Sequence, residues 1–304
     1  MTAPVSFIRP LTIVPSMITS TTAVTKLPAE GEWSAMGTYT KGQVVFRTAV
    51  GRRFENKIPG MNGNLPEEDR ERWYDLGATD QTTMFDAEVS SESIAPDVLT
   101  TVFRPGAFNA GWLLKLTGTS LTFTVKDAPG GATVFTETIS LEDSQPDDYW
   151  EHLFDPYRPR TEYLVTGLEP YMSCEVTVSI AFPGSVARCG MASLGDLVSV
   201  GGLALTGATA EPKSYSRIVT DERGKTSIET GKSALDLTGS CLVALDVADT
   251  VVDALRSTLG VPCPWILTDS QNMRSLRGFG LGTFKLTYDT TDKARLSYNI
   301  SGMI

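Results

Sequence analysis

Five short stretches between residues 99 and 180 place apolar residues beside Thr, Ser or Glu in the manner of half-buried β-strands. They cover residues 99–103, 112–116, 121–125, 133–139 and 175–180. Successive side chains of a strand point to opposite faces of its sheet, so a period of two indicates one buried and one exposed face. Turn residues at 127–131 and 183–184 separate the stretches. The pattern predicts a β-sandwich, of the jelly-roll type, over residues 86–200.

Residues 201–304 change character and predict a small α+β domain. A helix is expected near 247–259, where apolar residues recur at every fourth position, and Gly260 then occupies the position typical of a helix C-terminus. These apolar residues are Val247, Val251, Leu255 and Leu259. Strands are expected on both sides of the helix, two of them joined by a hairpin turn at Asp221–Lys225. The fold class expected for the whole chain is therefore mainly β.

Residues 1–30 are expected to form an extended arm. Four prolines interrupt the segment, and proline both removes a hydrogen-bond donor and holds the backbone extended. The other residues of the arm are too apolar for a solvated linker. Two locations for it remain open: the arm packs on its own protein, or it docks on a neighbouring subunit. Deletion of residues 1–28 is expected to leave a soluble, folded remainder that assembles poorly.

Residues 31–77 predict a small aromatic β-module, which a linker at 78–85 joins to the sandwich. Its pattern consists of Trp33, Tyr39, Gly42, Val44–Phe46, Pro59, Pro66 and Trp73. This spacing resembles the small chitin-binding modules of chitinases, which bind sugars because flat aromatic rings stack on pyranose faces. By that resemblance, Trp33, Tyr39 and Trp73 are the candidate carbohydrate-binding residues. The alternative is that the same rings form the core of the module.

The sequence offers few groups for catalysis. Its single histidine, His152, lies in an aromatic segment at 149–157, and no Gly-x-Ser-x-Gly motif is present. Asp147, Asp148 and Asp155 lie beside these aromatic residues, where a carboxylate pair for glycoside cleavage is conceivable. The three aspartates lack the spacing of a calcium-binding loop. The chain is therefore expected not to be an enzyme, with no catalytic residues and no metal site.

No cofactor is expected either. The glycine-rich stretch 278–282 precedes a predicted strand, so it offers no helix N-terminus to a phosphate group. The cysteines are far apart, without a Cys-x-x-Cys pair, and are expected to be small buried hydrophobic residues. They are Cys174, Cys189, Cys241 and Cys263.

The formal net charge of −10 argues against nucleic acid as a partner. A hydrophobic content of 41% and a charged content of 20% are typical of a globular protein. No apolar run is long enough to cross a membrane, and prolines interrupt the N-terminal segment where a signal peptide would lie. The protein is expected to be made in a cytoplasm and not to insert into membranes.

The order of these parts resembles a group of tail proteins from tailed bacteriophages. In that group, an apolar arm leads into a chitin-binding-like module, followed by a linker that closes in Met-Phe-Asp, a β-sandwich and an α+β tail. The matching positions are Trp73, Gly77, Thr83–Asp86, Cys189-Gly190, Leu194-Gly195 and Gly302-Met303. The resemblance implies a structural protein of the virion, located in the tail.

The sequence therefore favours a non-enzymatic structural subunit of a bacteriophage tail, its tip or its baseplate, that assembles as a ring or multimer with other tail proteins. Closed homo-oligomers of this kind are common among repeated subunits. A second hypothesis is a host-recognition protein whose aromatic module binds a cell-surface glycan. A third is a glycan hydrolase, which rests only on the abundance of carboxylates.

Overall fold

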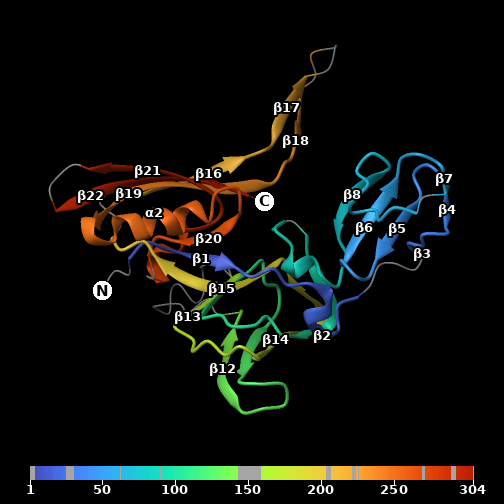
Figure 1. Ribbon diagram of the computed structural model, residues 1–304, viewed down its shortest axis with the longest axis horizontal. Coiled ribbons are helices and arrows are strands. Elements are labelled where there is room, and N and C mark those ends of the chain that lie inside the picture. Colours follow the sequence, from blue (N-terminus) through green and yellow to red (C-terminus); the bar gives the residue numbers. More distant parts are fainter. Residues whose placement is uncertain are drawn as a thin grey trace. The chain divides into compact units, whose positions relative to one another are not determined.

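The computed structural model describes residues 4–24, 31–61, 63–89, 91–142, 159–202, 207–220, 224, 226–268, 271–288 and 292–303. The described residues form mainly β structure, with large antiparallel sheets and one short α-helix, α2 (Figure 1). The predicted fold class, mainly β and sandwich-like, is confirmed. None of the helices among these residues has the length and apolar character needed to cross a membrane.

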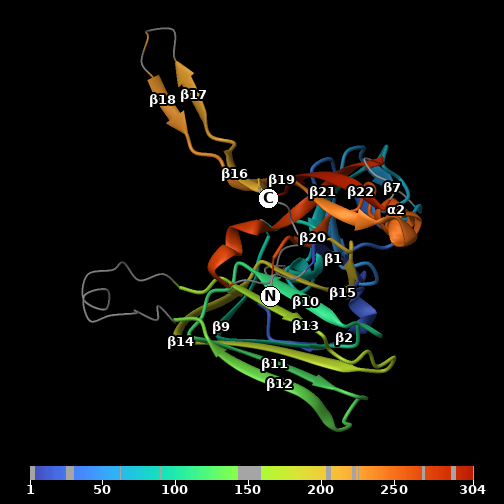
Figure 2. The same ribbon diagram turned by 90° about the vertical axis from the view of Figure 1, so that its left-hand side faces the viewer.

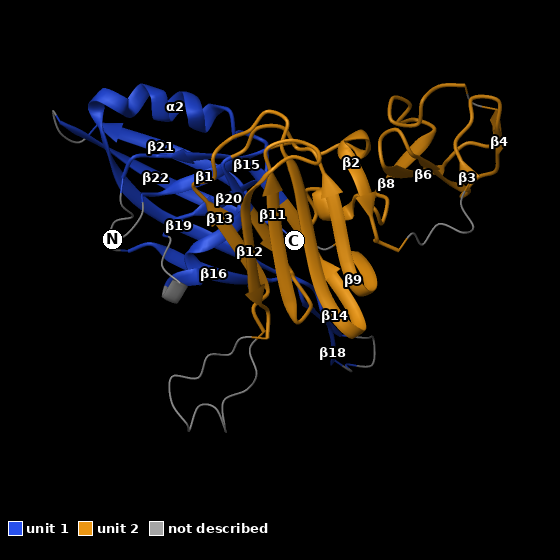
Figure 3. Ribbon diagram, turned by 90° about the horizontal axis from the view of Figure 1, so that it is seen from below, with its two compact units in different colours: residues 1–10, 109–111, 193–304 blue, residues 11–108, 112–192 orange. Residues whose placement is uncertain are grey.

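The chain divides into two compact units, coloured blue and orange in Figure 3. Unit 1 contains residues 1–10, 109–111 and 193–304, and unit 2 contains residues 11–108 and 112–192. Each unit thus combines separate stretches of the sequence, whereas the sequence pattern suggests domains that follow one another along the chain. Unit 1 is discontinuous because its N-terminal strand lies inside a sheet made by C-terminal residues.

The main sheet of unit 1 places neighbouring antiparallel strands in the order β15-β1-β20-β21-β22-β19-β16. Their bounds are Met191–Ser199, Ser6–Pro10, Cys263–Ile266, Arg277–Tyr288, Lys293–Gly302, Ser233–Ala244 and Thr209–Ser214. The helix α2 (Ala248–Arg256) lies along this sheet and buries Val251 and Leu255 in the same core as Trp265 and Leu296 (Figure 1). It falls within the stretch 247–259 where the sequence predicts a helix. Short 3₁₀ turns at Leu245–Val247 and Gln271–Leu276 precede α2 and β21.

Strand β1 is an inner strand of this sheet. Ser6 is paired with Ser199 of β15 on one side and with Ile266 of β20 on the other. The Phe7 side chain is fully buried, and its ring lies against that of Trp265 with centroids 5.0 Å apart. Of the two locations considered for the N-terminal arm, its described residues occupy the first, on their own protein. Strand β1 is held inside the sheet because its backbone groups find partners in β15 and in β20.

A β-hairpin continues outward from β16 and β19 in unit 1 (Figure 2). It consists of β17 (Arg217–Thr220) and β18 (Thr226–Glu229), which pair antiparallel with Ile218 opposite Ile228. These two side chains are 72% and 71% exposed. The hairpin therefore presents an apolar pair to solvent on a ribbon that is only marginally stable by itself.

The larger sheet of unit 2 has the strand order β12-β11-β14-β9-β2, and its neighbouring pairs are antiparallel. The strands span Thr133–Ser140, Ser120–Lys126, Glu175–Cys189, Ser93–Phe103 and Ile18–Thr21. Strand β11 buries every second residue, as its alternation predicts, with Phe123 fully enclosed. Strands β10 (Ala110–Leu114) and β13 (Glu162–Thr166) are neighbours in the strand order, and a 3₁₀ turn at Pro15–Met17 leads into β2.

The aromatic module of unit 2 is built on a small sheet of order β3-β5-β6-β8 and a separate pair of strands, β4 and β7. These strands span Gly31–Glu32, Val44–Arg47, Arg52–Asn56 and Trp73–Ala78 in the sheet, and Thr38–Tyr39 and Gly60–Met61 in the pair. The linker after the module is attached to it, because the Thr82 hydroxyl donates a 2.9 Å hydrogen bond to the carbonyl oxygen of Gly51. A 3₁₀ turn at Thr83–Phe85 follows, and it buries Met84 completely.

Candidate functional site

Two of the three predicted sugar-binding residues belong to the core of the module. Tyr39 is 6% and Trp73 2% exposed, and both pack with Val45 and Phe54. Their rings meet edge to face, with planes inclined by 72°. A ring that is buried on both faces cannot stack on a pyranose, and two inclined rings do not form one flat surface. The expectation that Trp33, Tyr39 and Trp73 form a common sugar-binding platform is therefore corrected.

Trp33, the third predicted residue, is half-buried and packs against the same core. The guanidinium group of Arg47 lies over its ring, 5.2 Å from the centroid. Arg47 is held in place by an ion pair with Glu67, at 3.0 Å. Because one face of the Trp33 ring is covered by this cation, the ring is not a free stacking surface.

The module nevertheless carries a pocket of about 400 Å³, in a place that the sequence pattern does not indicate. It is lined by Phe54, Lys57, Pro66, Glu67, Arg70, Trp73, Tyr74 and Asp75. The lining comes from two strands of the sheet, β6 and β8, and from the residues between them. Its volume is within the range of roughly 300–1,000 Å³ that is usual for small-molecule sites.

Strand β8 brings one buried and one exposed aromatic residue to this pocket. Trp73 points into the core, and Tyr74, the next residue, is 57% exposed. The backbone N–H of Trp73 donates to the carbonyl oxygen of Asp69 at 3.0 Å, which fixes the start of the strand behind the turn at 65–69. Period-two alternation in a strand predicts that one of two adjacent aromatic residues faces outward. That signal could have identified Tyr74 as the exposed ring.

Two polar atoms of the pocket-lining residues are buried without a hydrogen-bond partner among the described residues. They are the indole Nε1–H of Trp73, which is a donor, and the Oε2 oxygen of Glu67, which is an acceptor. Leaving such groups unpaired costs about 1–3 kcal/mol each. Both atoms have almost no accessible surface, so neither is presented to a ligand in the pocket.

The charges of the pocket are not balanced. Asp75 accepts two hydrogen bonds from the Arg52 side chain, at 2.8 and 3.0 Å, and Glu67 is paired with Arg47. Both carboxylates are thus neutralised by arginines that do not line the pocket. Lys57 lies 3.9 Å from the centroid of the Tyr74 ring and donates to the carbonyl oxygen of Arg70.

Neither Lys57 nor Arg70 has a carboxylate within ion-pair distance among the residues that the structure describes. Among those residues, the Lys57 ammonium is thus engaged only by the Arg70 carbonyl oxygen and the Tyr74 ring, and Arg70 is exposed.

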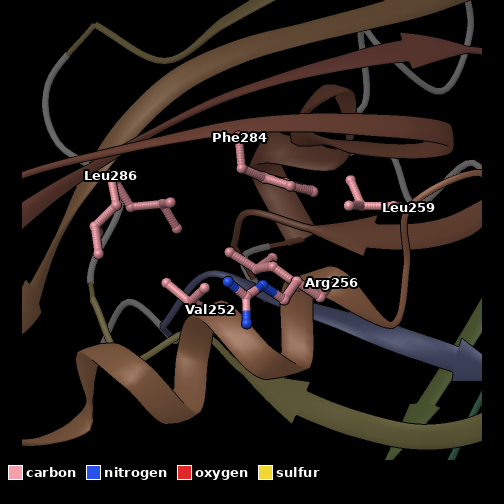
Figure 4. A pocket seen from close by; sticks show the side chains of 7 residues that line it. Val252, Arg256, Leu259, Phe284 and Leu286 are labelled. Atoms are coloured by element: carbon pink, nitrogen blue, oxygen red, sulfur yellow. The ribbon is translucent and has the colours of Figure 1, made fainter.

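A second pocket, of about 210 Å³, lies in unit 1 between α2 and strands β21 and β22 (Figure 4). Its lining is aliphatic and aromatic except for Arg256, which pairs with Asp253 at 3.1 Å. The lining residues are Val252, Leu255, Arg256, Leu259, Phe284, Leu286 and Leu296. No set of polar groups converges there, so this pocket offers no defined chemistry.

The described residues hold no group of three or more His, Cys, Asp or Glu side chains placed to bind a metal ion. All four cysteines are buried free thiols. His152 lies outside the described residues, together with the whole aromatic segment 149–157 and the aspartates at 147, 148 and 155. The predicted turn 221–225 also lies outside them, except for Gly224.

Comparisons with known proteins show no family. No family model matches the chain, and no curated protein matches its sequence. Among solved structures, one described as CpGH89CBM32-6 produced by Clostridium perfringens is similar over 38% of this chain and 83% of its own. The identity is 9% and the TM-score 0.25, which is too low to support a conclusion about fold or function.

Proposed function

We propose that the protein is a non-enzymatic structural subunit of a bacteriophage tail, tail tip or baseplate, assembling as a ring or multimer with other tail proteins. It would be made in the host cytoplasm and reside in the virion, with no nucleic acid partner and no insertion into membranes. The resemblance of its order of parts to phage tail proteins is one support. The other is an exposed apolar feature of unit 1 that a protein partner would bury.

That feature is the exposed pair Ile218 and Ile228 on the β17–β18 hairpin. A two-stranded ribbon is marginally stable alone, and this one continues beyond the last paired residues of β16 and β19, Ser214 and Ser233. Fully burying an isoleucine stabilises a contact by about 1.5–3 kcal/mol relative to leaving it exposed. A second subunit that covers the hairpin would supply this burial, as expected of a chain that repeats in an assembly.

Two glycines among the positions that match the phage tail proteins have structural roles. At Gly195 of β15, a Cβ atom would overlap the carbonyl oxygen of Arg9 in the neighbouring strand β1. At Gly302 of β22, it would overlap the backbone of Leu235. Glycine at these positions therefore permits a close approach of two backbones. Such positions are properties of the fold, and they support the resemblance without identifying the assembly.

The proposal is tested by the size of the purified chain and by its place in the particle. We expect light scattering after gel filtration to show a multimer that becomes monomeric in the double variant Ile218→Ser/Ile228→Ser, with unchanged circular dichroism. Met172→Ser is the matched control, because Met172 is 82% exposed and lies in unit 2. Antibody labelling should place the protein on phage tails. A monomeric wild-type chain, or particles without label, would contradict the proposal.

A second candidate function is recognition of a host cell-surface glycan by the aromatic module. The pocket beside Tyr74 favours it, because an exposed aromatic ring lines a cavity of the module. Single-site binding is expected to be weak, near about 1 mM, and several copies on one particle would raise the avidity. Loss of glycan binding in Tyr74→Ala with the fold intact would support this function, and Trp33→Ala tests the predicted platform in parallel.

The chain is proposed to lack enzymatic activity, so the hydrolase hypothesis is the least supported of the three. Purified protein is expected to leave host polysaccharide and peptidoglycan intact, measured as released reducing ends. Turnover that a single Asp or Glu substitution abolishes would overturn this expectation.

A further inference from the structure

We propose that residues 79–86 form a rigid joint, which holds the aromatic module in a single orientation relative to the larger sheet of unit 2. The joint follows β8 and leads toward β9. This inference concerns the motion of unit 2 and goes beyond the proposed function, on which it does not depend. Its basis is a set of buried side chains that bind the segment to the module on one side and to the sheet on the other.

The joint is buried where a flexible linker would be exposed. Thr79, Thr82 and Thr83 are 7%, 9% and 6% exposed, and Met84 is fully enclosed. Segments that move freely have few buried contacts and expose their backbone to water. These four residues have the opposite properties, so a change in the orientation of the module would require their burial to be lost.

On the side of the module, the joint is bound to the turn that ends at Gly51. The carbonyl oxygen of Gly51 accepts hydrogen bonds from the backbone N–H of Thr79, at 2.8 Å, and from the Thr82 hydroxyl, at 2.9 Å. Gly51 has a positive φ of 63°, and a Cβ atom there would lie 2.8 Å from Pro15 and 2.9 Å from Thr82. The module turn, the joint and the 3₁₀ turn of the arm therefore pack together without room for one more methyl group.

On the side of the sheet, the joint is bound to the first and last residues of β9. The buried hydroxyl of Ser93 donates to the carbonyl oxygen of Asp80, at 3.0 Å, and accepts from the backbone N–H of Met84, at 3.2 Å. The ring of Phe85 meets that of Phe103 edge to face, with centroids 4.8 Å apart. Because β9 is an inner strand between β14 and β2, these contacts attach the joint to the body of the sheet.

The contacts fix the module because they must be broken together. Swinging the module away from the sheet would expose the apolar Met84 and Phe85 side chains and separate the hydrogen-bonded groups from their partners. A buried polar network whose members are paired favours one arrangement of the groups around it. In a multimer, every copy would therefore present its module in the same direction.

Spin labels measure the orientation directly in the full chain. Met36→Cys in the module and Met172→Cys in the segment before β14 provide label sites, because these positions are 85% and 82% exposed. The four native cysteines are buried. Labelled chain is diluted with unlabelled chain, so that only distances within one chain are recorded. We expect double electron–electron resonance to give one narrow distance peak.

The variants assign this peak to the joint. Thr82→Val removes the hydroxyl that binds Gly51 and keeps a branched side chain, and the narrow peak is expected to be replaced by a broad distribution. Thr82→Ser, which keeps the hydroxyl, should retain the peak. Thr48→Val is the matched control, since it makes the same change at an exposed position of the module. Ser93→Ala should broaden the distribution from the side of the sheet, and circular dichroism checks that each variant is folded.

Limited proteolysis with chymotrypsin keeps the inference testable if Thr82→Val and Ser93→Ala fail to fold. A rigid, buried joint protects the bond after Phe85 in the native wild-type chain, and we expect no cleavage there. Rapid cleavage at Phe85, or a broad distance distribution in the folded wild type, would overturn the proposal. A narrow peak that survives in both folded variants would also overturn it. None of these outcomes depends on the oligomeric state, so failure of the joint leaves the proposed function standing.

Discussion

The indole ring of Trp73 meets the phenol ring of Tyr39 edge to face, with centroids 5.2 Å apart, inside the aromatic module. The Tyr39 hydroxyl also donates to the carbonyl oxygen of Ser34, at 2.9 Å, and accepts from the Ser34 N–H, at 2.6 Å. This arrangement ties β4 to β8 and to the segment before β4. Tyr39 and Trp73, two of the residues that the sequence suggests for sugar binding, are therefore the structural centre of the module.

Replacing Trp73 should therefore unfold the module. Trp73→Ala removes the largest side chain of a small core, and such truncations cost about 3–5 kcal/mol. Thermal unfolding followed by circular dichroism, with amide spectra to localise the change, measures the loss. Tyr74→Ala, at the neighbouring exposed position, is the control and should cost less than about 1 kcal/mol. Equal losses in the two variants would contradict the buried position of Trp73.

The N-terminal strand should be required for the stability of unit 1. Phe7→Ala removes a fully buried ring that packs against Trp265, so we expect a loss of about 3–5 kcal/mol in the free energy of unfolding. Arg9→Ala, an exposed position in the same strand, is the control. Denaturant titration provides the measurement.

Deletion of residues 1–28 should be more severe than either substitution. The sequence pattern predicts a soluble, folded remainder. In the structure, however, the deletion removes β1, so β15 and β20 would each lose the strand that pairs with them. The deletion variant is now expected to aggregate or to leave unit 1 unfolded. A soluble variant with native-like amide dispersion in residues 193–304 would argue against this.

Asp86 should make the stability depend on pH. Burial is the main cause that raises the pKa of its carboxyl from 3.8 to about 6, although Ser91 and the backbone N–H of Glu88 donate hydrogen bonds to it. The folded state therefore favours the protonated form more than the unfolded state does. This contribution to stability is fully present below pH 3.8 and is lost as the pH rises through about 6.

The free energy of unfolding of the wild-type chain should therefore contain a decrease between pH 3.8 and about 6 that is due to Asp86. In Asp86→Asn, the corresponding part of the pH dependence should disappear, while Asp97→Asn, at an exposed position, should leave it unchanged. Identical pH profiles for the wild type and Asp86→Asn would refute the role of this carboxyl.

The cysteines should be unreactive in the folded chain. Burial raises the pKa of the Cys189 and Cys263 thiols to about 12 and that of Cys174 and Cys241 to about 11. Since the thiolate is the reactive form, little of it exists near pH 8. A disulfide reagent should label the chain slowly in native buffer and quickly in denaturant. Rapid native labelling would show that at least one thiol is accessible.

The sequence carries much of the local structure. Alternation in residues 121–125 and 175–180 predicts strands, and the longer strands β11 and β14 include these positions. Apolar residues at every fourth position predict the helix that α2 provides. These signals are reliable because the period of an amphipathic element depends only on its own backbone geometry.

The candidate site was predictable only in part. The aromatic residues of the module stand out in the sequence, but composition does not tell which of them face the solvent. Trp73 and Tyr74 are adjacent, and their roles are opposite because successive residues of β8 face opposite sides. The charge balance of the pocket depends on Arg47 and Arg52, which come from other parts of the module.

The sequence by itself determined that this chain is mainly β, where its helix lies, and that residues 31–77 form an aromatic cluster. Tertiary structure alone decided that the N-terminal strand β1 lies between β15 and β20, that Tyr39 and Trp73 are core, and that Ile218 and Ile228 remain exposed. The physical reason is the range of the interactions. Periodicity is a local property, whereas the pairing of strands and the burial of a ring depend on residues that are distant in the chain.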